Sequence, residues 1–110
     1  MPEVRAVVYI DTTGRSTFTR WFEELDSQAA ARVTAALYRM GQGNFSNVEG
    51  VGSGVFEYRI DFGPGYRIYF GKDGETLVVL LGGSSKKRQQ QAIRAARQSW
   101  KEYKRGKAHG

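Results

Sequence analysis

The 110-residue sequence contains no cysteine, one histidine and two prolines. Without cysteine the chain has no disulfide framework and no thiolate metal site. The histidine, His109, lies in a polar C-terminal segment, so we expect neither a metal site nor a catalytic triad built on histidine. No apolar run approaches the roughly 20 residues of a membrane-spanning helix, and no apolar segment typical of a secretion signal is found near the start. We therefore expect a cytoplasmic protein that does not enter a membrane.

The 11 acidic residues are fewer than the 17 basic residues, and the basic residues are unevenly distributed. Residues 1–50 contain five arginines and six acids, a net charge of −1, whereas residues 51–110 contain twelve Lys/Arg and five acids, a net charge of +7. A basic half beside a neutral half indicates a polyanion or an acidic protein as the partner. The alternative is a basic surface that contacts only solvent. Hydrophobic residues make up 40% and charged residues 25% of the chain, as in an ordinary soluble domain of this length.

The clearest pattern runs from Val55 to Leu81 and predicts three strands joined by two tight turns. The strands are expected at 55–62, 66–70 and 76–81 because side chains alternate between apolar and polar, or are apolar throughout. Gly63-Pro64-Gly65 separates the first two strands, and Asp73-Gly74 favours a hairpin between the last two. The third strand is apolar on both faces, which is typical of a strand covered on both sides.

The alternation places Arg59 and Arg67 on one face of the sheet, next to each other if the strands form consecutive hairpins. Two like charges on adjacent strands repel each other unless an acid or a ligand lies between them. Glu57 and Asp61 share this face, so a structural ladder of salt bridges is one interpretation. The other is that the two guanidinium groups clamp a phosphate, whose oxygens match their geometry. Glu57, Tyr69 or a nearby lysine would then transfer protons.

The remaining segments complete an α+β domain with the order β-α-α-β-β-β-α. Apolar residues at helical spacing predict two helices packed as a hairpin on the sheet and a third at the C-terminus. The domain spans residues 1–110, with residues 105–110 expected to be a disordered tail. The other segments are a strand at 4–10, helices from Ser16 or Thr17 to 25 and over 28–40, a loop at 41–54 and a helix at 86–103.

The last helix begins with three cations, Lys86, Lys87 and Arg88. The first turn of a helix favours acids, because its unpaired N–H groups create a positive potential, and each cation there costs about 0.3–1 kcal/mol. Local rules of this kind are often broken at functional sites. We therefore interpret residues 83–88 as a docking point for phosphate or carboxylate, the alternative being an exposed basic turn without a ligand.

Taken together, these segments resemble the RelE/ParE superfamily of toxins from type II toxin–antitoxin systems, and in particular its HigB-like branch of phage-derived addiction module killer proteins. The similarity extends from about Val4 to Tyr103. It is carried by W-F-E-E-L-D, A-A-R-V, G-Q-G-N, G-V-F-E-Y-R-I-D-F-G-P-G-Y-R-I-Y-F, T-L-V-V-L-L-G-G, K-K and W-K-E-Y.

The resemblance implies a small, largely antiparallel sheet with the two N-terminal helices on one face, the catalytic groups on the other and the C-terminal helix at the edge. It also implies cleavage of mRNA, commonly on the ribosome, without a metal or other cofactor, and inhibition by a cognate antitoxin through which operator DNA is bound. The family's strand arginine falls on Arg67, the basic residue of the preceding strand on Arg59, and the basic group after the last strand on Lys86 or Lys87.

The catalytic group expected from the sequence and the resemblance therefore comprises Arg67, Arg59, Lys86 and Glu57, with Glu57 as the base and Glu49 and Tyr69 in reserve. Contacts to RNA or phosphate are expected from Lys87, Arg88, Tyr69 and Arg94.

One departure from the family leaves the function open. Many members place a tyrosine or histidine near the start of the final helix as the general acid, and the corresponding segment here reads K-K-R-Q-Q-Q. The alternatives are a non-enzymatic inhibitor of DNA gyrase of the ParE kind and a degenerate toxin that serves in an antitoxin-bound DNA regulator.

Overall fold

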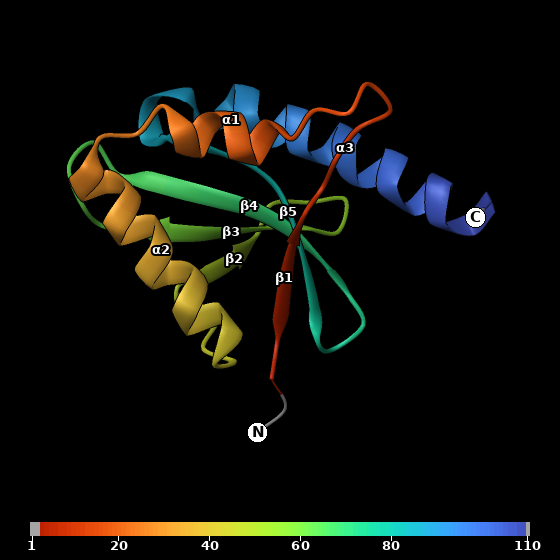
Figure 1. Ribbon diagram of the computed structural model, residues 1–110, viewed down its shortest axis with the longest axis horizontal. Coiled ribbons are helices and arrows are strands. Elements are labelled where there is room, and N and C mark those ends of the chain that lie inside the picture. Colours follow the sequence, from red (N-terminus) through yellow and green to blue (C-terminus); the bar gives the residue numbers. More distant parts are fainter. Residues whose placement is uncertain (1–2, 110) are drawn as a thin grey trace.

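The computed structural model describes residues 3–109, and this part of the chain forms an α+β fold with one five-stranded sheet and three α-helices (Figure 1). A short 3-10 turn, η1, precedes the last helix. The elements in chain order are β1 (Arg5–Val8), α1 (Thr17–Glu23), α2 (Ser27–Gly41), β2 (Val48–Gly50), β3 (Val55–Ile60), β4 (Tyr66–Asp73), β5 (Leu77–Ser85), η1 (Lys86–Arg88) and α3 (Gln89–His109).

The strands lie in the order β1-β5-β4-β3-β2. The β2–β3, β3–β4 and β4–β5 pairs are antiparallel, whereas β1 runs parallel to β5 at one edge. The two consecutive hairpins predicted from residues 55–81 are confirmed. Gly63, Gly65 and Gly74 in their turns have φ of 56°, 77° and 75°, which glycine adopts without the steric cost that other residues meet.

Several bounds of the sheet differ from the sequence-based expectation. The strand expected at 4–10 is limited to Arg5–Val8, the one expected at 55–62 ends at Ile60, and the one expected at 66–70 continues to Asp73. The predicted loop at 41–54 contains β2, which is too short to show an alternating pattern and gains its hydrogen bonds from β3. The last strand does not end at Leu81 but continues to Ser85, because residues 83–85 pair with the first residues of β4.

Helices α1 and α2 cover one face of the sheet, as predicted. Their first turns are fixed by side-chain caps: Ser16 Oγ accepts a hydrogen bond from the Thr19 amide at 3.1 Å, and Asp26 Oδ1 accepts one from the Ala29 amide at 2.8 Å. Serine and aspartate are among the residues most favoured at this position, because their short side chains reach the free N–H groups of the first turn. The buried core on this face comprises Phe18, Val33, Ala36, Met40, Tyr58, Ile60, Ile68, Phe70, Val78 and Leu80.

Helix α3 covers the opposite face, so the expected position at the sheet edge is wrong. Its apolar stripe of Ile93, Ala96 and Trp100 is buried against side chains of β3, β4 and β5. The Trp100 ring lies so close to Gly71 that a Cβ atom there would be 2.4 Å from the ring. An apolar helix stripe is stabilised by burial against another apolar surface, and here that surface is the face of the sheet.

The expected disordered tail at 105–110 is also wrong as far as the structure describes it, because α3 continues to His109. The Tyr103 hydroxyl and the Lys107 ammonium both bind the carboxylate of Asp73, the last residue of β4. These contacts tie the last turns of the helix to the sheet, while Gly110 lies outside the described residues. Over residues 3–109, no helix has the length and apolar character required to cross a bilayer.

Candidate functional site

Arg59 of β3 and Arg67 of β4 are direct cross-strand partners. The sequence predicted this juxtaposition from strand alternation and hairpin order, and the register confirms it. Both side chains belong to the face of the sheet that α3 covers, beyond the apolar contacts of that helix. The two arginines therefore lie side by side at the end of this face.

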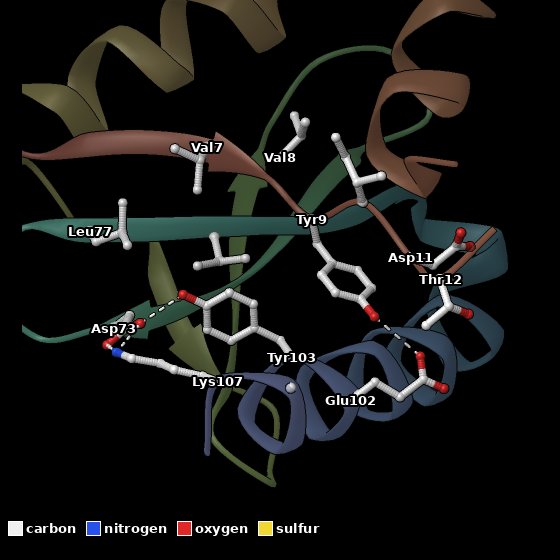
Figure 2. A pocket seen from close by; sticks show the side chains of 13 residues that line it. Val7, Val8, Tyr9, Asp11, Thr12, Asp73, Leu77, Glu102, Tyr103 and Lys107 are labelled. Atoms are coloured by element: carbon white, nitrogen blue, oxygen red, sulfur yellow. Dashed lines mark hydrogen bonds and ion pairs between the residues drawn. The ribbon is translucent and has the colours of Figure 1, made fainter. Parts of the chain in front are cut away.

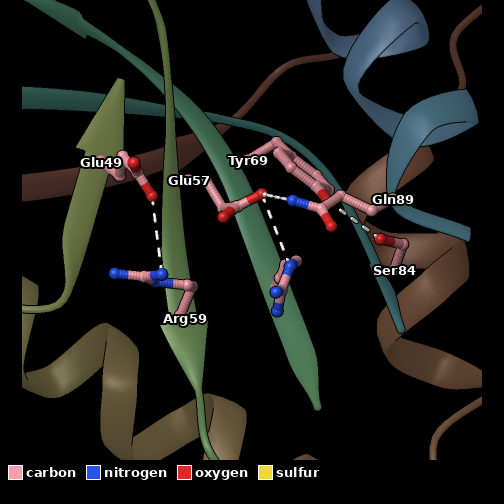
Figure 3. Close-up of polar contacts among 7 residues, drawn as sticks. Glu49, Glu57, Arg59, Tyr69, Ser84 and Gln89 are labelled. Atoms are coloured by element: carbon pink, nitrogen blue, oxygen red, sulfur yellow. Dashed lines mark hydrogen bonds and ion pairs between the residues drawn. The ribbon is translucent and has the colours of Figure 1, made fainter. Parts of the chain in front are cut away.

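Arg67 is held by a buried carboxylate. Its side chain is only 12% exposed, and its Nε lies 3.5 Å from Glu57 Oε2. Glu57 is itself 2% exposed and accepts a hydrogen bond from Gln89 Nε2 at 2.8 Å (Figure 3). The buried Nε of Arg67 has no hydrogen-bond partner among the described residues. Glu57 and Gln89 thus form a polar support that keeps a positive charge at a largely buried position.

Arg59 is held much more loosely. Its Nη1 lies 3.5 Å from Glu49 Oε2, and both side chains are more than half exposed (Figure 3). An exposed ion pair of this kind contributes at most about 1 kcal/mol. The salt-bridge interpretation is therefore confirmed in part: Glu57 forms an ion pair with Arg67, and Glu49 forms one with Arg59. Asp61, the other candidate acid, instead lines a cavity beside the two arginines.

This cavity, which we call the arginine cavity, has a volume of about 360 Å³ and brings together three cations and one carboxylate. Lys86 reaches it because the Lys86 amide donates a hydrogen bond to the Gly65 carbonyl at 2.7 Å, which fixes η1 against the β3–β4 turn. The size and charge of the cavity suit a phosphate group. Its lining residues are Asn47, Arg59, Ile60, Asp61, Gly65, Arg67 and Lys86.

Two predicted site residues lie behind the cavity. Glu57 is buried beneath Arg67 and does not belong to the lining. Tyr69 is fully buried, and its hydroxyl shares a hydrogen bond of 3.0 Å with Ser84 Oγ (Figure 3). Burial raises the pKa of the Tyr69 phenol above its usual value, so the phenol keeps its proton near neutral pH. Both side chains are therefore placed to support the cavity wall.

The other predicted phosphate contacts do not converge on the arginine cavity. Arg88 lines a separate hollow with Trp21 and Tyr66 between α1 and the start of α3. Arg94 lines another hollow on one flank of α3, and Lys87 is exposed on η1. Of the three cations that begin the C-terminal helical segment, only Lys86 is in the lining of the arginine cavity.

Sequence reasoning missed the role of Asn47 and Asp61. The Asn47 carbonyl accepts a hydrogen bond from the Arg59 amide at 3.1 Å, which places this loop residue at the cavity. No sequence pattern marks such a contact. Asp61 follows the last residue of β3, where the predicted alternation no longer applies, and it lines the cavity without forming the ion pair that the sequence offered as one interpretation.

A larger, more apolar groove of about 660 Å³ lies elsewhere, between β1 and the C-terminal half of α3 (Figure 2). Its three acids have internal partners. Glu102 accepts a hydrogen bond from Tyr9, Asp73 is bound by Tyr103 and Lys107, and Asp11 accepts hydrogen bonds from Thr13. The acids of this groove are thus bound within the fold, whereas Asp61 and Lys86 of the arginine cavity have no ion-pair partner among the described residues. Among the described residues, no three His, Cys, Asp or Glu side chains are grouped so that they could hold a metal ion.

The chain is similar in sequence to a known protein. No protein-family model and no solved structure matches the chain. A protein of Haemophilus influenzae (strain ATCC 51907 / DSM 11121 / KW20 / Rd), described as an uncharacterized protein, is 41% identical over 66 residues. The matched segment covers 59% of this chain and 67% of the Haemophilus protein. The chain therefore belongs to the same family as this Haemophilus influenzae protein.

Proposed function

We propose that this protein is the toxin of a type II toxin–antitoxin module and a metal-free endoribonuclease of the RelE/ParE type that cleaves mRNA. The observation that carries this proposal is the cavity at which Arg59, Arg67 and Lys86 converge. The arrangement of the fold also supports it, with α1 and α2 on one face of the sheet and the cations on the other. A cation-lined hollow of this size accepts the phosphodiester that such an enzyme cleaves.

The reaction requires little beyond positioning and charge stabilisation. The RNA 2′-hydroxyl attacks the adjacent phosphorus, the bond from phosphorus to the 5′ oxygen breaks, and a 2′,3′-cyclic phosphate and a 5′-hydroxyl are formed. The Arg67 guanidinium binds the phosphate oxygens and stabilises the negative charge that develops on them. Because Glu57 fixes Arg67 before substrate arrives, the charge is already in position at the transition state.

The proton transfers are assigned to Asp61 and Lys86, which line the cavity together with the two arginines. Asp61 replaces Glu57 as the base that removes the proton of the 2′-hydroxyl, because Asp61 is exposed in the cavity whereas Glu57 is buried behind it. The Lys86 ammonium donates a proton to the leaving 5′ oxygen. Solvent restores both groups after the product leaves.

The proposal is tested by inducing Arg67→Ala and wild-type protein in a bacterial host and scoring growth arrest and mRNA cleavage by primer extension. We expect the variant to be harmless and mRNA to remain intact. Arg39→Ala, an exposed arginine on α2, is the matched control and should keep full toxicity. Lys86→Gln repeats the test at an exposed position of the cavity, where misfolding is not a concern. Equal cleavage by wild type and both cavity variants would rule the assignment out.

A second function is favoured by one observation: the described lining of the arginine cavity contains no tyrosine or histidine that could act as general acid. A ParE-like inhibitor of DNA gyrase needs no such group. Rapid induction of the DNA-damage response with intact mRNA would support this candidate, whereas translation arrest with cleaved mRNA would exclude it. A degenerate toxin that acts only in an antitoxin-bound DNA regulator would leave growth unchanged when expressed alone.

The proposed partners follow from the proposed function. A cognate antitoxin with an acidic surface would complement the basic half of the chain and close the arginine cavity. The mRNA, on the ribosome, is the proposed substrate, and operator DNA is contacted only through the antitoxin. Co-expression with the product of a neighbouring reading frame should abolish toxicity and yield a complex that survives purification.

A further inference from the structure

One flank of α3, beside the loop that precedes β3, carries four exposed cations in one stripe, Arg94, Arg97, Lys101 and Lys104. Their spacing of three, four and three residues places them on one side of the helix. With Ser53 and Gln98 they line a hollow of about 410 Å³ that shares no residue with the arginine cavity. We call these four side chains the helix stripe.

The wall of this hollow is a fixed part of the fold. Both Nε and Nη2 of Arg97 donate to the Val51 carbonyl, which fastens the loop before β3 to α3. Ser53 in this loop has a φ of 58°, in the left-handed region that a residue other than glycine seldom occupies. At Gly54 an added Cβ would lie 2.8 Å from Trp100 Nε1. The loop thus packs tightly on the helix and holds Ser53 beside the cations.

The helix stripe has an unfavourable charge pattern for a helix in isolation. Like charges three or four residues apart destabilise a helix by about 0.2–0.5 kcal/mol per pair, and the stripe contains three successive pairs. Among the described side chains, no carboxylate lies within ion-pair distance of Arg94, Arg97 or Lys101. An anionic ligand would relieve this repulsion.

The lining favours a nucleic-acid backbone over a protein as that ligand. Protein interfaces are built on a buried apolar or aromatic centre, whereas every residue that lines this hollow is polar or charged. From Arg94 to Lys104 the helix rises about 15 Å at 1.5 Å per residue, which is longer than a single phosphate group. A chain of phosphates matches this length, and its contacts need no particular base.

We propose that the helix stripe binds the phosphodiester backbone of RNA outside the arginine cavity and anchors the strand that the cavity cleaves. The identification of the polyanion as RNA rests on the proposed function. The anchoring contacts themselves are independent of the sequence of the bases, so they add affinity and no base preference.

The experiment compares two double variants with equal loss of charge. Arg94→Gln with Lys101→Gln removes two cations of the helix stripe, and Arg20→Gln with Arg39→Gln removes two exposed cations from α1 and α2. Binding of a fluorescent 20-nucleotide single-stranded RNA is titrated at several salt concentrations. Each phosphate contact contributes about 0.7 to the slope of log K against log salt, so the stripe variant should lower the slope by about 1.4. The control variant should keep the wild-type slope.

An unchanged slope in the stripe variant, or an equal decrease in the control, would overturn the proposal. Competition that is equally strong from polyglutamate, at matched charge, would also overturn it and identify an acidic protein as the ligand. Cleavage by Arg67→Ala reports separately on the proposed function. If the stripe variant lowers the slope but Arg67→Ala still cleaves, RNA binding by the helix stripe is supported and the catalytic assignment fails. If the stripe variant leaves the slope unchanged and Arg67→Ala does not cleave, only the proposed RNA binding by the helix stripe is rejected.

Discussion

The two faces of the sheet are built from the same strands but carry different side chains. On β4, Ile68 and Phe70 point to the face covered by α1 and α2, where every buried side chain of the core is apolar or aromatic. Arg67 and Tyr69 point to the opposite face, which is apolar only beneath α3 and becomes polar and charged beyond it. Because side chains alternate along a strand, a rigid apolar core lies directly behind the charged groups of the site.

The two arginines also differ in how far they are exposed to solvent. They are direct neighbours in the register, yet Arg67 is 12% and Arg59 is 54% exposed. Arg67 on β4 is supported by buried Glu57, whereas Arg59 on β3 has as its partner the exposed Glu49 of the edge strand β2. A largely buried and an exposed cation thus lie side by side on neighbouring strands.

The first face should carry most of the stability, so its disruption has the largest expected effect. Phe70→Ala removes a fully buried ring between α2 and the sheet and should lower the free energy of unfolding by about 3–5 kcal/mol. Urea denaturation measures this change. Tyr38→Ala, at a side chain that is 69% exposed on α2, is the control and should have little effect. Similar losses from both variants would contradict the placement of the core.

The second face depends on the close approach of Trp100 to Gly71. Gly71→Ala introduces a methyl group 2.4 Å from the indole ring and should cost about 1–3 kcal/mol through overpacking. The tryptophan emission should shift to longer wavelength as α3 moves away from the sheet. Gly106→Ala has free space around it in the same helix and should instead stabilise the protein by about 0.5–1 kcal/mol. Destabilisation by both would refute the packing argument.

The two arginines should differ in their structural cost. Arg67→Gln leaves the buried Glu57 without its charged partner and should lower the free energy of unfolding by about 1–3 kcal/mol. Arg59→Gln breaks only an exposed ion pair, so we expect a change below about 1 kcal/mol. Thermal unfolding at neutral pH compares the two. A larger loss at Arg59 would mean that the support of Arg67 by Glu57 contributes little.

The smallest expected effect concerns the attachment of the end of α3. Hydrogen bonds from Lys107 and Tyr103 lower the pKa of the Asp73 carboxyl below its usual 3.8. A group whose pKa is lower in the folded state stabilises the fold above its unfolded pKa and loses this contribution as the pH falls through its folded pKa. Asp73→Asn should therefore flatten the dependence of the melting temperature on pH below about pH 4. Glu75→Gln, at an exposed acid of the turn that follows Asp73, should leave that dependence unchanged.

Much of this architecture follows from local sequence patterns. Alternating side chains and turn glycines determine β3, β4 and β5, and with them the neighbourhood of Arg59 and Arg67, because hairpin pairing between consecutive strands leaves few other registers. Capping residues and helical spacing determine where α1 and α2 begin and which sides are apolar. Each of these patterns involves only a few neighbouring residues, so the strands and helices that depend on them can be predicted from the sequence alone.

Only the tertiary structure decided which charged groups meet. The sequence gives no reason for Lys86 rather than Lys87 or Arg88 to reach the arginine cavity, for Asn47 to join it, or for Glu57 to lie behind it while Asp61 faces it. It shows the apolar stripe of α3 but not the face of the sheet that this stripe covers. These positions depend on contacts between segments that are far apart in the chain. Such contacts are determined by the packing of the whole domain, and they produce no periodic pattern within any one segment.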